Sequence, residues 1–510
     1  MGSIPSLVRA LAAAVVCASL ASCTTSGARE PAASQLDPAL GPIVESNASP
    51  PVHGTLIQAP ALSGAQKISG NDRVYTADQD SNTVSVVNPA TNKVLGTIAL
   101  GKPRLSPSAD VLGAMYDGEI DVHGLGFSRD GKWLDVIDVT TNAVHIIDTA
   151  TNKVVRTMYV GRAPHEGFFS PDGTRLWVAV RGQDYISVID WRAGKEVDRI
   201  HTEDGPSKVV FSPDGKFAYV NHLRASRLDQ IDVASHKIIK RVQIPAQAGG
   251  SSDEAISPDG RDIWLGMPTN GRTTAVVNAR TLRVEAVLNT GPRTNHPNFV
   301  TVGGVDYAYM TVGGLNETLV YRRSKTGAAP TLVKTIHNNG HGPHGIWPSP
   351  DNTRIYVALQ NSDAVDVIDT RTNSVIKTLP IGQSPMALVY VARSTPATST
   401  QNLGRQGLGM RTQNLPLRVS GSSGQGTALI RALPGLNEVT IGATGLPPDQ
   451  TFTAYASDGT RTTALMSMMS NEFGNIDESL SYSYFFPNHY TSVILKPGTP
   501  AGEHEPGPAM

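Results

Sequence analysis

Cysteine is nearly absent from this chain of 510 residues, and its scarcity excludes several kinds of protein. Both cysteines, Cys17 and Cys23, lie near the N-terminus. No disulfide can therefore hold the rest of the chain together. A cysteine-based zinc site, an iron–sulfur cluster and a covalently attached c-type haem are excluded too, because each needs several thiolates or a Cys-x-x-Cys-His sequence.

An excess of one charge is also absent. The 43 Lys and Arg residues nearly balance the 44 Asp and Glu residues, so we expect no nucleic-acid partner. Three catalytic motifs are missing, namely Gly-x-x-x-x-Gly-Lys-Ser/Thr, His-Glu-x-x-His and Gly-x-Ser-x-Gly. Their absence does not exclude an enzyme that draws single residues from distant segments.

The first 23 residues account for both cysteines. Arg9 precedes a short apolar run at 11–18, which is too short to span a membrane. The sequence Leu-Ala-Ser-Cys that ends at Cys23 resembles the lipobox of bacterial lipoproteins. The resemblance implies that residues 1–22 are a signal peptide and that Cys23 carries a lipid, whereas the alternative is an ordinary signal peptide with a chance cysteine. Residues 23–60 are then a lipidated cysteine and a flexible tether.

The lipobox resemblance also implies a location. We expect a protein of the cell envelope, held to a membrane through its N-terminal lipid. Thr24 follows the cysteine instead of Asp, and this resembles a sorting signal for the outer membrane. The protein would then face the periplasm or the cell surface.

Two phrases repeat along the body of the chain. Ser-Pro-Asp-Gly or a close relative starts at serines 128, 170, 212, 257 and 349, which gives spacings of 42, 42, 45 and 92 residues. Alternating apolar runs such as Ala143–Asp148 and Ala364–Asp369 form the second phrase. Each period reads as four short strands, which is typical of a β-propeller blade. We count seven blades, at about 64–100, 121–161, 163–204, 205–246, 250–291, 294–338 and 342–382.

The residues after the last repeat complete the predicted fold, which is all-β. Residues 385–391 read as one further innermost strand, and we expect it to join the first blade and close the ring. Residues 413–497 alternate apolar and polar residues between turns, which predicts a small antiparallel β-sandwich. The predicted domains are a seven-bladed β-propeller at 61–393, a linker at 394–412, the β-sandwich at 413–497 and a disordered tail at 498–510.

The repeats resemble the YVTN-type (YncE-like) propeller repeats of bacterial lipoproteins and surface proteins over about 64–391. That resemblance implies the fold and leaves the function open.

Five histidines fall just before the first strand of a predicted blade: His123, His165, His296, His341 and His344. His123, His165 and His344 stand five residues before the turn serine, and His296 matches them if one residue is inserted after its turn. Ser207, Ser252 and Met386 hold the position elsewhere. Equivalent positions of a ring surround one axis, so the histidines predict a site there. They would bind a transition metal, a haem iron or another small molecule, or hold the ring together through backbone hydrogen bonds.

Two enzyme families share parts of these phrases. The segment around His123 resembles the one that bears the axial histidine in the haem propeller of cytochrome-type nitrite reductases. This implies an iron-ligand role for His123, with His165, His296 and His344 as proton donors, although that propeller has eight blades. The Gly-Pro-His phrase at His344 is similar to one in seven-bladed lactonases.

The leading interpretation is a lipid-anchored binding or scaffold module with a histidine-lined central funnel that takes a protein or small-molecule ligand. The alternative is a propeller oxidoreductase that depends on a metal or haem; a lactonase-type hydrolase is a third reading. No cofactor is assigned by the sequence.

Overall fold

The computed structural model describes residues 66–101, 104–105, 116–117, 121–245, 249–268, 272–324, 327–395, 399–421 and 423–500. The predicted signal peptide at 1–22, Cys23 with the tether to residue 60, and the end of the tail at 501–510 lie outside these residues. The described part is almost entirely β-structure, with one short 3₁₀ turn, η3 (Gln360–Ser362). None of its helical segments is long and apolar enough to cross a membrane.

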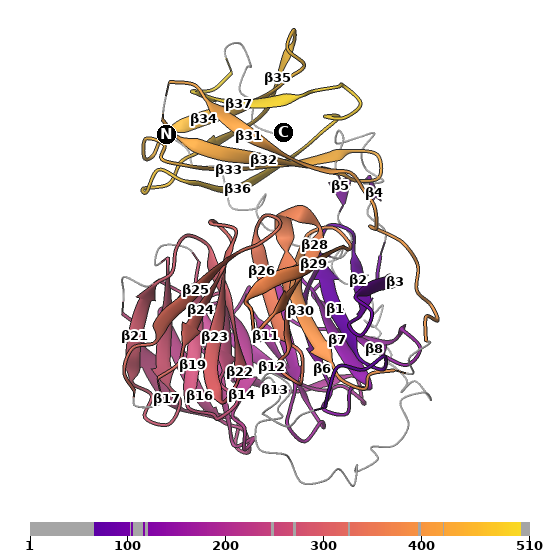
Figure 1. Ribbon diagram of the computed structural model, residues 1–510, viewed down its shortest axis with the longest axis vertical. Coiled ribbons are helices and arrows are strands. Elements are labelled where there is room, and N and C mark those ends of the chain that lie inside the picture. Colours follow the sequence, from indigo (N-terminus) through magenta and orange to yellow (C-terminus); the bar gives the residue numbers. More distant parts are fainter. Residues whose placement is uncertain are drawn as a thin grey trace, which may run out of the picture.

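Seven four-stranded antiparallel sheets form the blades of the propeller, as predicted (Figure 1). Blade one contains β30 (Pro385–Val391), β1 (Arg73–Asp78), β2 (Thr83–Asn88) and β3 (Lys93–Ala99). Blade two contains β6 (Val122–Phe127), β7 (Trp133–Asp138), β8 (Ala143–Asp148) and β9 (Lys153–Tyr159). Blade three contains β10 (Pro164–Phe169), β11 (Leu176–Val180), β12 (Tyr185–Asp190) and β13 (Lys195–His201). Blade four contains β14 (Pro206–Phe211), β15 (Phe217–His222), β16 (Arg227–Asp232) and β17 (Lys237–Gln243).

Blades five to seven follow the same order, from the innermost strand outward. Blade five contains β18 (Asp253–Ile256), β19 (Asp262–Met267), β20 (Thr273–Asn278) and β21 (Val284–Asn289). Blade six contains β22 (Thr294–Val302), β23 (Val305–Val312), β24 (Glu317–Arg322) and β25 (Thr331–His337). Blade seven contains β26 (Pro343–Pro348), β27 (Arg354–Leu359), β28 (Ala364–Asp369) and β29 (Ser374–Pro380). Two short strands, β4 (Arg104–Leu105) and β5 (Tyr116–Asp117), pair in the insertion between blades one and two.

The last strand of the propeller closes the ring, as the sequence predicted. β30 pairs with β1 in antiparallel register, with Arg73 opposite Val391 and Tyr75 opposite Val389. The innermost strands β6, β10, β14, β18, β22, β26 and β30 then contact one another in cyclic order. Blade one is therefore built from both ends of the propeller sequence, and its sheet has no open inner edge.

The repeated Ser-Pro-Asp-Gly turn has the local chemistry expected of it. In blade four, Ser212 Oγ donates to Asp214 Oδ1 at 2.7 Å, and the Gly215 amide donates to the Ser212 carbonyl oxygen at 2.8 Å. Gly215 has a φ of 71°, a conformation that favours glycine. The turn joins the innermost strand of a blade to the next strand out.

One buried position departs from the repeat. In six blades the residue at one equivalent position of the second strand, opposite the innermost strand, is aromatic, namely Tyr75, Trp177, Tyr219, Trp264, Tyr309 and Tyr356. Blade two has Asp135 there, opposite Gly126. Asp135 is fully buried, and neither carboxyl oxygen has a hydrogen-bond partner in the described structure. Burial raises the pKa of Asp135 well above its usual value, so the group keeps its proton in the folded protein.

The C-terminal residues form the sandwich-like domain. Its strands are β31 (Thr412–Val419), β32 (Gln425–Ala432), β33 (Asn437–Thr444), β34 (Thr451–Ser457), β35 (Thr462–Met469), β36 (Ile476–Ser483) and β37 (Ser492–Pro497). β31 belongs to both halves, because residues 412–417 pair with β32 while 418–419 pair with β37. That second pairing is parallel, whereas the other strand pairs of this domain are antiparallel. Val439, Phe452 and Val493 lie fully buried in its core.

The sandwich lies against one end of the ring (Figure 1). Arg431 is the centre of this contact and is only 3% exposed. Its guanidinium forms ion pairs with Asp80 at 2.7 Å, Asp363 at 3.2 Å and Glu438 at 3.2 Å. Asp80 and Asp363 lie in turns of blades one and seven, whereas Glu438 belongs to the sandwich itself. A second ion pair joins Arg293 of the propeller to Glu478 of β36.

The segment predicted as a linker follows the propeller surface. Asn402 Nδ2 donates to the Thr151 carbonyl oxygen at 2.9 Å, Gly404 forms a β-bridge with Thr97, and Gln406 Nε2 donates to the Ser81 carbonyl oxygen at 2.7 Å. Its described residues thus lead from the outer strand of blade one to the end that carries the sandwich.

Candidate functional site

Four of the five predicted histidines come together at the end of the ring that carries the sandwich. We call His123, His165, His296 and His344 the axial histidines. They form two pairs between adjacent blades, His123 with His165 and His296 with His344, whose ring centroids lie 4.4 and 4.5 Å apart. His341 does not join them, because it is exposed and makes hydrogen bonds through its backbone to the turn at 361–362.

Glycine follows two of the axial histidines and lets neighbouring innermost strands approach closely. Gly124 and Gly345 come directly after His123 and His344 on the innermost strands. A Cβ atom on Gly124 would lie 2.2 Å from the His165 carbonyl oxygen, and one on Gly345 would lie 2.5 Å from the Met386 carbonyl oxygen. Any other residue would therefore push the neighbouring innermost strands apart.

Three axial histidines are held through Nδ1. His165 donates to the Ser207 carbonyl oxygen at 2.8 Å, and His344 donates to the Met386 carbonyl oxygen at 2.9 Å. His296 Nδ1 lies 3.0 Å from Asp253 Oδ2. A neutral imidazole that donates through Nδ1 has its lone pair on Nε2. The hydrogen bonds thus assign the same tautomer to all three rings.

The Nε2 atoms have different surroundings. The Nε2 atoms of His123 and His165 lie 2.6 Å apart. Because the proton of neutral His165 is on Nδ1, the proton of this hydrogen bond belongs to His123. Asn295 Nδ2 donates to His344 Nε2 at 2.7 Å, which leaves the buried Asn295 Oδ1 without a partner in the described structure.

Burial favours the neutral form of the axial histidines. Burial is the largest cause that lowers the pKa of each of them, and it lowers that of His296 to about 3. The positive charge of Arg181 lowers all four pKa values further. One guanidinium thus lies within electrostatic reach of every imidazole in the cluster.

Arg181 follows β11 and reaches toward blades four and five. Its Nη2 donates to Ser207 Oγ and, at 3.4 Å, to the carbonyl and hydroxyl oxygens of Ser252. Its Nε is buried and has no hydrogen-bond partner among the described residues. Burial lowers the pKa of Arg181 to about 9, so the side chain remains charged at neutral pH.

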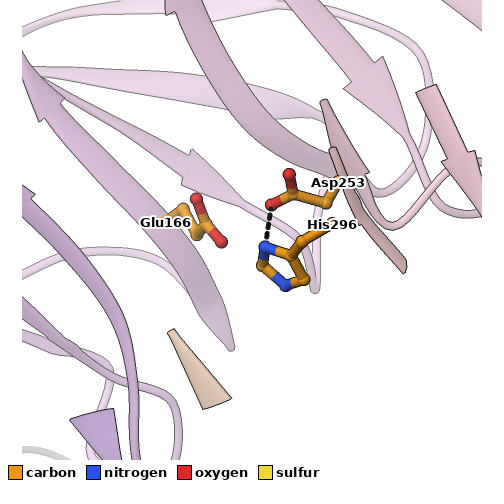
Figure 2. Close-up of side chains that lie close together, drawn as sticks. All are labelled: Glu166, Asp253 and His296. Carbon is orange, nitrogen blue, oxygen red and sulfur yellow. Dashed lines mark ion pairs between the residues drawn. The ribbon is translucent and has the colours of Figure 1, made fainter. Parts of the chain in front are cut away.

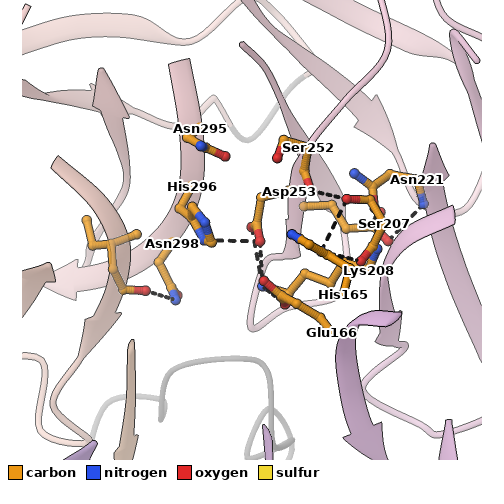
Figure 3. A network of polar contacts seen from close by, with 12 residues as sticks. His165, Glu166, Ser207, Lys208, Asn221, Ser252, Asp253, Asn295, His296 and Asn298 are labelled. Carbon is orange, nitrogen blue, oxygen red and sulfur yellow. Dashed lines mark hydrogen bonds and ion pairs between the residues drawn. The ribbon is translucent and has the colours of Figure 1, made fainter. Parts of the chain in front are cut away.

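A buried group of acids and one lysine lies beside His296 (Figures 2 and 3). Lys208 Nζ lies 3.1 Å from Glu166 Oε2 and 2.9 Å from Asp253 Oδ2. Burial raises the pKa of Glu166 to about 7, against the opposing effect of Lys208. Ligand atoms of Glu166, Asp253 and His296 lie within 4.8 Å of one another, a spacing that a metal ion can use. In this structure, however, the Lys208 ammonium supplies the cation for both carboxylates.

Sequence reasoning missed Arg181 and this buried group. Glu166, Lys208 and Asp253 occupy one equivalent position, directly after the histidine or serine of their blades. The strand register corrects the prediction for His296: it holds this same position in blade six, and Asn295 holds the position of the other axial histidines. The same alignment of repeats that identified the histidines could have found them. Arg181 occupies no marked position in the repeat and has no such sequence signal.

A haem does not fit in the cavity that lies inside the ring beside His296. This cavity is lined by Leu125, Phe168, His296 and Trp347, among others, and its volume is about 10 Å³, the space of about one water molecule. His123 Nε2, the atom that the nitrite reductase resemblance assigns to iron, is engaged with His165. We derive no haem chemistry for this protein.

Comparison with known proteins identifies the fold and not the function. No family model matches the chain, and no curated protein matches it. A functionally unknown protein from Desulfotomaculum acetoxidans is 12% identical with a TM-score of 0.50, covering 62% of this chain and 98% of that one. Hydrazine synthase from Kuenenia stuttgartiensis is 21% identical with a TM-score of 0.49, covering 65% and 98%.

A periplasmic gluconolactonase from Pseudomonas aeruginosa is 19% identical with a TM-score of 0.48, covering 63% of this chain and 99% of that one. Such low identities carry no information on substrate or cofactor. What this chain shares with known structures is therefore the β-propeller fold.

Proposed function

We propose that this protein is a lipid-anchored ligand-binding module of the cell envelope, with its ligand site at the axial histidines. The observation that carries the proposal is the gathering of four histidines in two pairs, with ring centroids 4.4 and 4.5 Å apart, and the contact of Arg181 with Ser207, which also accepts from His165. Buried polar groups normally have hydrogen-bond partners. Here Arg181 Nε and Asn295 Oδ1 lack them, and a bound ligand would supply them.

The position of the sandwich supports the same function. It contacts turns of blades one and seven, and Arg293 just ahead of His296 in blade six. A ligand at the axial histidines would therefore lie beside the boundary between the two domains. Sites at domain boundaries are common for small ligands.

The test uses residues 24–510 with Cys23 removed, and compares them with a His165→Ala/His344→Ala double variant. We expect the parent to retain or bind a small ligand that mass spectrometry and calorimetry detect, and the variant to lose it while its circular dichroism spectrum is unchanged. A His341→Ala variant is the matched control, because that histidine is exposed. Equal binding by all three proteins would contradict the proposed site.

A bound transition metal is the second candidate, and it would support the oxidoreductase reading. The fixed Nδ1 atoms of His165, His296 and His344 favour it, since metal-binding histidines usually donate their other ring nitrogen to a carbonyl or carboxylate. Metal analysis of the same preparation tests this candidate. A stoichiometric metal that disappears in the double variant would support it.

The membrane anchor needs a separate test. Cys23→Ala should release the full-length protein from membranes, because a lipid chain holds it there in this proposal. Fractionation with antibody detection measures the change. Continued retention of the variant in the membrane fraction would contradict the anchor.

A further inference from the structure

We infer that the axial site binds a carboxylate monoanion, and that the Arg181 guanidinium receives it. This inference rests on the proposed function and names the ligand class of the same site. Its starting observation is that Arg181 is a cation without a directly bonded counter-ion in the part of the chain that the structure describes.

Neither of the two nearest described acids forms an ion pair with Arg181. Glu166 and Asp253 are close enough to act on it electrostatically. Both, however, form their ion pairs with Lys208, at 3.1 and 2.9 Å. Among the described residues, the hydrogen bonds of the guanidinium go to hydroxyl and carbonyl oxygens of Ser207 and Ser252. A charge so enclosed and without a counter-ion destabilises the protein, so an anion that pairs with it would bind favourably.

The unused donors of Arg181 define the shape of the ligand. All of its hydrogen bonds in the described structure come from Nη2, while Nε has none. Arginine binds carboxylates through two parallel N–H donors, a geometry that fits a planar group with two oxygens. Arg181, whose Nε–H has no hydrogen-bond partner among the described residues, is therefore suited to bind a carboxylate.

The local charge favours an anion of charge −1. Lys208 is balanced by Asp253, with Glu166 as a further acid whose pKa lies at about 7. Lys208 and Arg181 together therefore exceed the acids by one positive charge when Glu166 is protonated, and the four charges balance when Glu166 is ionised. A dianion would overcompensate this charge close to Asp253 and Glu166, and like charges repel strongly in a partly buried site.

The neutral imidazoles agree with this ligand. Their lone pairs accept hydrogen bonds and do not compete for the anion as acids would. His296 Nε2 carries such a lone pair when Nδ1 is directed at Asp253.

The experiment is calorimetric titration of residues 24–510, which lack Cys23, using acetate and sulfate as probes up to about 50 mM. We expect acetate to bind more tightly than sulfate. Arg181→Gln should lower the acetate affinity at least tenfold, because it removes the charge and the paired donors. Arg181→Lys should lower it as well, since a lysine retains the charge but not the fork. Arg162→Gln is the matched control, because Arg162 is exposed at the same end of blade three and contacts the Gly182 carbonyl oxygen.

The outcomes separate this inference from the proposed function. Acetate binding that survives Arg181→Gln, or tighter binding of sulfate, would overturn the carboxylate assignment. Absence of acetate binding, together with histidine-dependent binding of a metal or another ligand, would overturn it and leave the proposed function standing. Absence of any ligand at the axial histidines would refute both. The thermal unfolding temperature of unliganded Arg181→Gln should equal or exceed that of the parent, which verifies that the variant folds.

Discussion

Replacing Arg431 by methionine should separate the sandwich from the propeller. Methionine fills a similar volume but leaves Asp80, Asp363 and Glu438 together without a cation. The lost hydrogen bond to the Gln360 carbonyl oxygen, 2.5 Å long, adds to the effect. Removing one partner of a buried ion pair costs about 3–5 kcal/mol. At 1.4 kcal/mol per tenfold, the docking equilibrium should shift by about 10²- to 10³-fold or more.

Calorimetry and limited proteolysis measure this shift. In the parent we expect the two domains to unfold together, and in Arg431→Met the sandwich should unfold at a lower temperature. Proteases should then cut the segment at 399–411, which the parent holds against the ring. Arg461→Met is the control, because Arg461 forms an exposed ion pair with Asp458, and such pairs contribute about 0–1 kcal/mol.

A rescue experiment distinguishes electrostatics from packing. Adding Asp80→Asn and Glu438→Gln to Arg431→Met removes most of the uncompensated negative charge. We expect much of the lost stability to return. If Arg431→Met alone has the unfolding temperature and cleavage pattern of the parent, the ion-pair cluster does not hold the domains together and the reasoning fails.

Two further predictions concern the interior of the ring. Asp135→Asn should stabilise the protein at pH 7 and lose this advantage toward pH 4. Above about pH 4 the unfolded chain releases the Asp135 proton, whereas burial retains it in the folded protein. The parent therefore loses about 1.4 kcal/mol of folding stability per pH unit until the raised pKa is reached. Urea unfolding at several pH values measures this, and an advantage that does not change with pH would contradict it. Lys208→Met should destabilise the fold by about 3–5 kcal/mol, because Glu166 and Asp253 lose their cation. Addition of Asp253→Asn should recover part of the loss, and a single variant as stable as the parent would show that the pair contributes nothing.

The blade count was predictable from sequence because it depends on local chemistry. A turn such as Ser212–Gly215 is stabilised by hydrogen bonds among its own residues, so its sequence is visible in every repeat. The closing strand at 385–391 was predictable for the same reason, since it carries the innermost-strand pattern without the rest of a blade.

The axial site was predictable only in part. Equivalent positions in a ring must face one axis, so the alignment of repeats brought His123, His165 and His344 together. The alignment was wrong for His296: Thr294 pairs with Val312 as Pro164 pairs with Val180, so Asn295 holds the histidine position in blade six and His296 follows it. Adjacency in sequence misled the prediction for His341, which lies in an exposed turn ahead of β26. Arg181 could not be found, because its contacts with blades four and five depend on how three blades pack.

The docking of the sandwich was equally invisible in the sequence. Arg431 looks like an ordinary polar residue on an alternating strand. Its partners Asp80 and Asp363 lie in turns of two different blades, and they adjoin only because the ring is closed. A prediction would have required the arrangement of blades one and seven before the sandwich was considered.

Closure by β30 also sets the order in which the molecule can mature. The Tyr390 hydroxyl donates to Asp72 across 318 residues of chain, so blade one stays incomplete until almost the whole propeller has emerged. Closing a loop of that length costs only about 2 kcal/mol more than closing one of a single blade, because the entropy grows with the logarithm of length. The delay matters more than the energy, because the inner edge of β1 stays open to other chains until the closing strand has been synthesised. The sandwich follows the closing strand along the chain, and the acids that hold Arg431 come from turns of blades one and seven. Its docking therefore reports that the ring has closed.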